Sequence, residues 1–169
     1  MPQITPEQAG GQNVCALLDT IAFTEGTDRP PQPTHDRGYD VLVGGKLFAS
    51  YARHPDILVR ISSKLTSTAA GRYQILARQW AAYQPRLHLP DFGPLSQDLY
   101  AINQFREQGA LPLILAGRLE EAIAKINDIW ASLPGSPYGQ PTVSMDEALG
   151  IYAMHDGTYI DSSTTETSP

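Results

Sequence analysis

The sequence predicts an α+β fold in which helices dominate, organised as one domain with a single small β-hairpin. Three observations predict this class. Several segments have apolar residues at helical spacing, one short stretch is β-branched and aromatic around a Gly-Gly pair, and 169 residues suit one hydrophobic core. Hydrophobic residues make up 41% and charged residues 18% of the chain, which is typical of a globular protein and not of a fibrous or disordered one.

The expected domain spans residues 13–156. Residues 1–12 are polar and Gly-rich, so we expect a mobile N-terminal segment there. Residues 157–169 end in DSSTTETSP, which has no apolar periodicity, and we expect this tail to be disordered.

The first predicted helix begins next to Asn13. Apolar residues from Val14 to Ala22 recur at i, i+3, i+4, i+7 and i+8, which is the pattern of a helix with one buried face. Asn13 in front suits an N-cap, and Gly26 behind suits a stop.

A loop and a hairpin follow. Residues 30–33 include three prolines and predict a loop. The stretch YDVLVGGKLF over residues 39–48 is β-branched and aromatic around Gly44 and Gly45, which predicts a tight hairpin.

Two further helices are expected in the middle of the chain. One begins at Ser67 or Thr68, runs to about residue 83 with an apolar face that includes Tyr73 and Trp80, and is ended by Pro85. The next begins at residue 94, where a proline suits the first turn, and stops at the glycine at position 109.

The last third of the chain predicts a short helical piece near Leu113 and two amphipathic helices. The first of these lies within residues 117–130 and is closed by a Pro-Gly turn at 134–135. Ser144 and Glu147 form a capping-box pattern, which predicts a final helix through about His155.

Charge and composition exclude several classes of function. A net charge of -6 and a pI near 5.1 argue against nucleic acid as a partner, because phosphate binding needs clustered Lys and Arg. No apolar run approaches 18 residues, so we expect no stable membrane insertion. No signal-peptide pattern is present, so we expect the protein to be made in the cytoplasm. Cys15 is the only cysteine, and the four histidines lack metal-ligand spacing, so no intramolecular disulfide and no metal site are expected.

Glu25 is the one glutamate whose position calls for a chemical explanation. It follows Ile21 by four residues and Ala22 by three, so it continues the apolar face of the first helix. Burial and the negative end of the helix dipole both raise the pKa of a carboxyl group. A carboxyl that stays protonated near neutral pH is what general-acid cleavage of a glycosidic bond requires.

The alternative explanation is structural. Glu25 could be a half-buried residue paired with Arg29, Arg37 or Arg72, and helix phase does not decide between the two explanations.

Four segments, IAFTEGTD (21–28), RGYDVLVGGKLF (37–48), LTSTAAGRYQIL (65–76) and INDIWASLPGSPYGQ (126–140), resemble the lambda-phage-type endolysins of the lysozyme superfamily. The motifs SQD at 96–98 and REQGALP at 106–112 extend the match over about residues 14–140. The resemblance implies a two-lobed lysozyme-like fold, with a small β-hairpin subdomain and a saccharide cleft between the lobes.

The implied activity is lytic transglycosylation of peptidoglycan at the β-1,4 bond between N-acetylmuramic acid and N-acetylglucosamine. By this resemblance Glu25 protonates the glycosidic oxygen and then acts as base toward the muramyl C6 hydroxyl, leaving 1,6-anhydromuramyl ends, without metal or cofactor. A hydrolytic lysozyme with Asp28 or Asp40 as second carboxylate is one alternative, because hydrolysis ordinarily uses two carboxylates. A saccharide-binding protein without catalysis is the other.

The resemblance also implies a set of substrate-binding residues. They are Ser67, Thr68, Tyr73, Gln74, Trp130, Leu133, Tyr138 and Gln140. The residues themselves leave other roles open, since Ser67 and Thr68 suit helix caps, while Tyr73 and Trp130 lie on apolar helix faces and suit the core.

One position departs from the family pattern. The family has a histidine directly before GYD, whereas this chain has Arg37 there and its nearest histidine is His35.

The resemblance further suggests a phage lysis protein that acts on the glycan strands of peptidoglycan as a monomer. Such a protein is made in the host cytoplasm without a signal peptide and reaches the wall, in the periplasm, with the help of a separate membrane-permeabilising partner.

Overall fold

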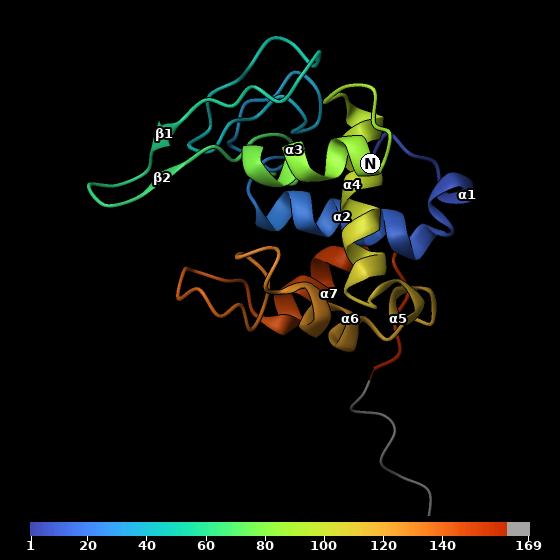
Figure 1. Ribbon diagram of the computed structural model, residues 1–169. Coiled ribbons are helices and arrows are strands. Elements are labelled where there is room, and N and C mark those ends of the chain that lie inside the picture. Colours follow the sequence, from blue (N-terminus) through green and yellow to red (C-terminus); the bar gives the residue numbers. More distant parts are fainter. Residues whose placement is uncertain (162–169) are drawn as a thin grey trace, which may run out of the picture.

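The structure is a computed structural model, and it describes residues 1–161 (Figure 1). The helices are α1 (Pro6–Ala9), α2 (Gln12–Thr24), α3 (Ala77–Arg86), α4 (Pro94–Glu107), α5 (Leu111–Leu115), α6 (Leu119–Ile126) and α7 (Met145–Met154). The strands β1 (Val59–Arg60) and β2 (Thr66–Ser67) pair antiparallel, with Val59 opposite Ser67. The predicted α+β class with dominant helices is confirmed.

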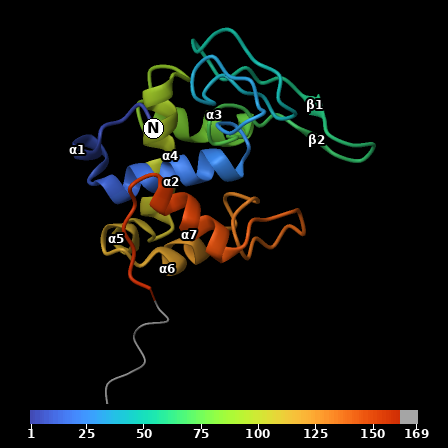
Figure 2. The same cartoon turned by 180° about the vertical axis from the view of Figure 1, so that it is seen from behind.

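Helix α2 runs through the middle of the molecule. Its residues 14–22 are all buried, and it contacts α1, α4, α5 and α7. Figures 1 and 2 show α3, the β1–β2 hairpin and the long loops on one side of α2, and α5, α6 and α7 on the other. This arrangement of two lobes around a central helix agrees with the fold class that the sequence predicts.

The segment before α3 is not helical, although the sequence predicts a helix from Ser67 or Thr68. Gly71 has φ +79° and Gln74 has φ +48°, and two left-handed residues interrupt a helix. A side chain at Gly71 would collide with the amide of Gln97, which accepts a hydrogen bond from the Arg72 N–H at 2.9 Å. Pro85, expected to end this helix, instead lies inside its last turn.

The predicted hairpin over residues 39–48 is also wrong in its extent. Only an isolated bridge joins Val41 to Leu47, with a tight turn at Gly44 and Gly45 between them. Within this segment Leu42 N–H donates to Lys46 O at 2.7 Å and Phe48 N–H donates to Asp40 O at 2.9 Å, while Val43 N–H donates to Ala69 O at 2.9 Å, so a hairpin is present but shorter than predicted. Strands β1 and β2 lie at 59–60 and 66–67, where the sequence gives no strand prediction.

The later helices agree more closely with prediction. Helices α4, α5 and α7 lie where the sequence places them, and the Ser144 hydroxyl accepts the Glu147 N–H at 3.1 Å as the cap of α7. Helix α6 ends at Ile126, a turn earlier than predicted, so Trp130 lies beyond it.

The N-terminal segment packs against the domain, where the sequence led us to expect a mobile stretch over residues 1–12. Ile4 is buried and its N–H donates to Asp98 at 2.8 Å, while Thr5 and Gln8 form a capping box on α1. The local polarity of this segment does not reveal that it packs, because Asp98, which accepts the Ile4 N–H, lies 94 positions away in the sequence.

The expected tail over residues 157–169 also begins with contacts. Thr158 donates its N–H to Asn13 at 2.9 Å, so Asn13 anchors this segment and does not cap α2, whose N-cap is Gly11. The rest of the expected tail, residues 162–169, lies outside the described residues. Within residues 1–161, no helix combines the length and apolarity needed to cross a membrane.

Candidate active site

Glu25 is the C-cap residue of α2. Its N–H bonds to Ile21 O at 2.8 Å, and Gly26 with φ +75° then turns the chain away from the helix axis. In Figures 1 and 2, the β1–β2 hairpin and the loop of residues 134–143 both project on the side where α2 ends. Glu25 therefore lies at the base of two projecting segments, one from each lobe.

The Glu25 carboxyl is half-buried and has a neutral partner. The Ser132 hydroxyl donates to Glu25 Oε1 at 2.7 Å. Burial raises the pKa of Glu25, and the hydrogen bonds from Ser132 act in the opposite direction without cancelling it. This is the environment of a carboxyl that remains able to donate a proton at a higher pH than an exposed glutamate.

The three arginines considered as partners of Glu25 are engaged elsewhere. Arg72 pairs with Asp19 and Asp28, Arg37 pairs with Asp36, and Arg29 lies over the Phe23 ring. No ion pair to Glu25 occurs in the part of the chain that the structure describes. The structural explanation of Glu25 as an arginine partner is therefore wrong.

The two other candidate carboxylates are both occupied by internal contacts. Asp28 accepts from Arg72 Nη1 at 2.6 Å. Asp40 is 5% exposed and accepts from the Thr34 hydroxyl at 2.5 Å and the His35 N–H at 2.9 Å. Both carboxylates fix loops, and Asp40 is too deeply buried to reach a saccharide.

A buried ion cluster that the sequence analysis did not identify supports the turn after Glu25. Arg72 is fully buried, and its guanidinium binds Asp19 on α2, Asp28 and the carbonyl of Arg37. The Thr27 hydroxyl donates to Arg72 O at 2.7 Å, which joins the same turn to the GRYQ segment. Asp19, a buried acid among the apolar residues of α2, was the sequence signal for this cluster.

Three of the predicted substrate-binding residues belong to the core. Tyr73, Trp130 and Leu133 are at most 3% exposed. The Tyr73 hydroxyl donates to Asp98 at 2.5 Å, and Trp130 Nε1 donates to Tyr73 O at 3.1 Å. Because their side chains are enclosed and their polar atoms are paired internally, these residues do not present a surface to a saccharide. They hold the GRYQ segment against the loop after α6.

Ser67 and Thr68 do not cap a helix that begins beside them, which is what one of the two explanations from sequence proposes, because α3 begins only at Ala77 with Leu76 as its N-cap. Ser67 accepts the Ala69 N–H at 3.1 Å, and Thr68 accepts at 3.2 Å from the N–H of Ala77, the first residue of α3. Both side chains remain half-buried, so part of each stays at the surface.

The remaining predicted binding residues differ in their accessibility. The Gln74 amide donates to Gly71 O at 3.0 Å and to Val41 O at 3.3 Å, which binds it to the protein itself. Tyr138 is 57% exposed, with its hydroxyl donating to Asp128 O at 2.8 Å. Tyr138 and its neighbour Gln140 are the exposed members of the set, and both lie on the projecting 134–143 loop.

Arg37, which replaces the family histidine, faces the N-terminal segment. Its guanidinium donates to Met1 O at 3.0 Å and to the side chain of Gln3 at 2.8 Å. Its role here is to fix residues 1–3 to the 34–40 loop.

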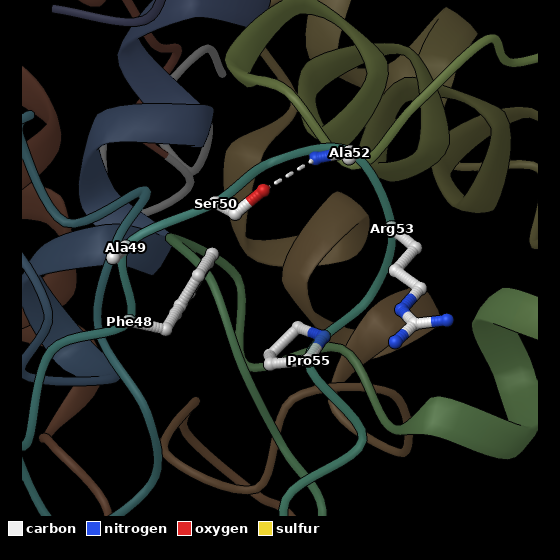
Figure 3. Close-up of a pocket in the computed structure, with 6 residues that line it drawn as sticks. All are labelled: Phe48, Ala49, Ser50, Ala52, Arg53 and Pro55. Atoms are coloured by element: carbon white, nitrogen blue, oxygen red, sulfur yellow. Dashed lines mark hydrogen bonds between the residues drawn. The ribbon is translucent and has the colours of Figure 1, made fainter.

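Two surface cavities lie near these loops. One, of about 560 Å³, is lined by Phe48, Ala49, Ser50, Ala52, Arg53 and Pro55 (Figure 3). It contains none of the predicted site residues, and Arg53 is its one charged lining group. A second, of about 350 Å³, includes Asp28 and Arg29 and therefore adjoins the turn that follows Glu25. No cluster of three or more potential metal ligands occurs within residues 1–161.

Comparison with known proteins gives one consistent family. A family model described as Endolysin matches residues 15–159. The chain is 49% identical to the endolysin of Escherichia phage lambda, over 85% of this chain and 90% of that protein. It is 44% identical to the endolysin of Escherichia phage P2, over 86% of this chain and 94% of that protein.

Solved structures agree with this result. Bacteriophage lambda lysozyme complexed with a chitohexasaccharide superposes with a TM-score of 0.87 at 45% identity, covering 95% of this chain and all 100% of that one. A second structure, lysozyme from bacteriophage lambda, gives a TM-score of 0.84 at 44% identity with the same coverage.

Proposed function

This chain belongs to the endolysin family, and from that membership we propose that it is a peptidoglycan lytic transglycosylase with Glu25 as catalytic acid and base. As a lambda-type endolysin with a lysozyme-like fold, it is a cell-wall-lytic glycosidase. The observation on which the finer proposal rests is a half-buried carboxyl with a raised pKa and no cationic partner among the described residues.

In the proposed reaction, Glu25 transfers its proton to the oxygen between N-acetylmuramic acid and N-acetylglucosamine, and the bond from the muramyl C1 to that oxygen breaks. The muramyl C6 hydroxyl then attacks C1 while its proton passes to the Glu25 carboxylate. The products are a 1,6-anhydromuramyl end and a free N-acetylglucosamine hydroxyl, and Glu25 ends the cycle protonated as it began.

The state of the other carboxylates supports transglycosylation over hydrolysis. A hydrolase ordinarily uses a second carboxylate as nucleophile or to activate water. Asp28 is bound to a fully buried arginine and Asp40 is enclosed by its own loop, so neither is free for that task. An attacking oxygen supplied by the substrate removes the requirement.

We propose that the saccharide lies against the surface where the two projecting segments flank Glu25. Tyr138 and Gln140 offer an exposed ring and an amide there, and Ser67 and Thr68 lie at the root of the opposite hairpin. A solved relative is described as a complex with a chitohexasaccharide, which supports an extended glycan strand as ligand. Tyr73, Gln74, Trp130 and Leu133 then support this surface from behind.

The proposed setting is host-cell lysis at the end of a phage cycle. We propose that the protein is made in the host cytoplasm and acts as a monomer on peptidoglycan in the periplasm. A separate membrane-permeabilising partner would admit it to the wall.

Mass spectrometry of muropeptides released from purified peptidoglycan tests the reaction. Wild type is expected to release 1,6-anhydromuramyl ends and Glu25→Gln to release none, while Glu147→Gln on the exposed start of α7 keeps wild-type activity. Reducing muramyl ends would make the protein a hydrolase. Release by Glu25→Gln equal to wild type would refute Glu25 as the catalytic acid, and binding without release by wild type would leave a saccharide-binding protein.

A further inference from the structure

The Ser132 hydroxyl lies between two oxygen acceptors at the end of α2. Its Oγ is 2.7 Å from Glu25 Oε1 and 2.9 Å from Thr24 Oγ1. Thr24 is buried, and its own hydroxyl donates to Ile21 O at 3.1 Å. A row of four oxygens therefore runs from a helix carbonyl, through two hydroxyls, to the carboxyl of Glu25.

A count of protons limits what this row can do. A serine hydroxyl has one proton, so Ser132 can donate fully to only one of its two neighbours at a time. The Thr24 proton is directed to Ile21 O, which leaves the lone pairs of Thr24 Oγ1 available to Ser132. A carboxylate accepts a hydrogen bond about twice as strongly as a neutral oxygen, so the charge of Glu25 decides which neighbour receives the proton.

We propose that Ser132 is a positioning residue whose hydroxyl turns from Thr24 Oγ1 to Glu25 Oε1 when the carboxyl becomes ionised, and turns back when it is reprotonated. This inference rests on the proposed role of Glu25 as acid and then base. Ionised Glu25 accepts from the Ser132 hydroxyl, whereas protonated Glu25 donates to Ser132 Oγ while Ser132 donates to Thr24 Oγ1. Both states of Glu25 are therefore paired without a charged residue.

The same arrangement orients the carboxyl. The Ser132 hydroxyl holds Glu25 Oε1 at 2.7 Å. Ser132 belongs to the loop after α6. This loop and the β1–β2 hairpin lie on opposite sides of α2 (Figure 1). The orientation of the acid therefore depends on the packing of that loop against the end of α2.

No charged group near Glu25 takes the place of Ser132 as its hydrogen-bond partner among the described residues. The charged groups on the neighbouring segments are Asp28, Arg29, Arg72 and Asp128. Asp28 and Arg72 pair with each other, and Arg29 lies over the Phe23 ring. Burial is the largest cause of the raised pKa of Glu25, and the hydrogen bonds from Ser132 are the causes that lower it.

The test is the pKa of Glu25 in wild type and in two variants, measured by NMR titration of protein labelled with 13C at the glutamate carboxyl carbons. Glu25→Gln identifies the resonance. Ser132→Ala removes the donor to the ionised form, so the acid dissociation constant should fall roughly 10- to 100-fold. Thr24→Val removes only the acceptor used when Glu25 is neutral, so the constant should rise, by about 2- to 10-fold. The two shifts have opposite signs, which a general loosening of the site would not produce.

Two further variants serve as controls. Ser136→Ala removes a buried hydroxyl on the same loop for which the described residues offer no hydrogen-bond partner, and it should leave the titration unchanged. Ser132→Thr keeps a hydroxyl and should restore most of the wild-type value. In activity assays, Ser132→Ala should lower kcat more than it changes KM and should move the alkaline limb of the pH profile upward.

Shifts of the same sign in Ser132→Ala and Thr24→Val, or a Ser132→Ala titration equal to that of Ser136→Ala, would overturn the switch. If Ser132→Ala does not fold, Thr24→Val still decides, because only the switch requires its dissociation constant to rise. Failure of the proposed function has a different signature, which is wall cleavage by Glu25→Gln whatever the titrations show.

Discussion

The buried cluster around Arg72 gives a prediction whose size follows from the contacts. Arg72 and Asp19 have side chains 1% and 2% exposed and lie 2.5 Å apart, while Asp28, at 2.6 Å, is 30% exposed. Replacing Arg72 by methionine keeps most of the side-chain length but leaves Asp19 as a buried charge. Loss of one partner of a buried ion pair costs about 3–5 kcal/mol. The half-exposed Asp28 can return to water and adds little.

Two weaker contacts limit the loss and do not remove it. The Met1 amino group lies 3.2 Å from Asp19 and is largely exposed, and His155 lies 3.5 Å away. For a chain of this size, each kcal/mol corresponds to about 2–4 °C in Tm, so Arg72→Met should lower Tm by roughly 6–20 °C. The assay is differential scanning calorimetry together with urea unfolding.

The control is a surface ion pair of the same chemical type. Arg86 pairs with Glu107 at 3.3 Å but is 62% exposed, so Arg86→Met should cost less than about 1 kcal/mol. The double variant Arg72→Met with Asp19→Asn should recover much of the loss, since no buried charge remains. An Arg72→Met protein as stable as Arg86→Met would refute the view that this cluster stabilises the turn after Glu25.

Three other outcomes are expected. Glu25→Gln should raise Tm near neutral pH by a few degrees, about 1 kcal/mol. Because the pKa of Glu25 is raised in the folded protein, wild type loses stability as pH rises from the ordinary value of 4.5 through the folded pKa. The Tm difference between Glu25→Gln and wild type should therefore grow over this pH range in calorimetry, and a constant difference would contradict a raised pKa at Glu25. Trp130→Phe should cost at least about 1–3 kcal/mol in urea unfolding, since Tyr73 O loses a buried donor; a loss near zero would mean that the bond is unimportant. In the Glu25→Gln background, Tyr138→Ala should weaken chitohexasaccharide binding about 2- to 12-fold by calorimetry with unchanged Tm, whereas Tyr138→Phe, which loses only the bond to Asp128 O, should bind normally.

The sequence predicts correctly those elements whose signals are local. The apolar spacing of α2 and α4 and the Ser144 cap of α7 lie within a few neighbouring residues, so each helix can be recognised without its partners. Glu25 is identified in the same way, because helix phase alone puts it on the buried face. Its raised pKa agrees with that placement.

The predictions that fail concern segments whose conformation depends on distant residues. Tyr73 has the spacing of a helical core residue, yet its segment is a turn with left-handed backbone at Gly71 and Gln74, and the distant Gln97 leaves no room for a side chain at Gly71. Residues 41–43 have strand composition, but their backbone hydrogen bonds are divided between residue 46 of the hairpin and residues 69–71, so the predicted hairpin stays short. The same limit applies to Trp130, which is 3% exposed and donates its Nε1–H to Tyr73 O, 57 positions away.

The sequence by itself thus determined the helical class, the central helix and the acid at its end, together with the motifs that indicate the family. The tertiary structure decided which groups surround that acid. Ser132 lies 107 positions from Glu25, and Arg72 lies 53 positions from Asp19, so no periodic pattern could pair them. Hydrogen bonds and ion pairs act over a few ångströms, and only packing of the two lobes brings such distant residues within that range.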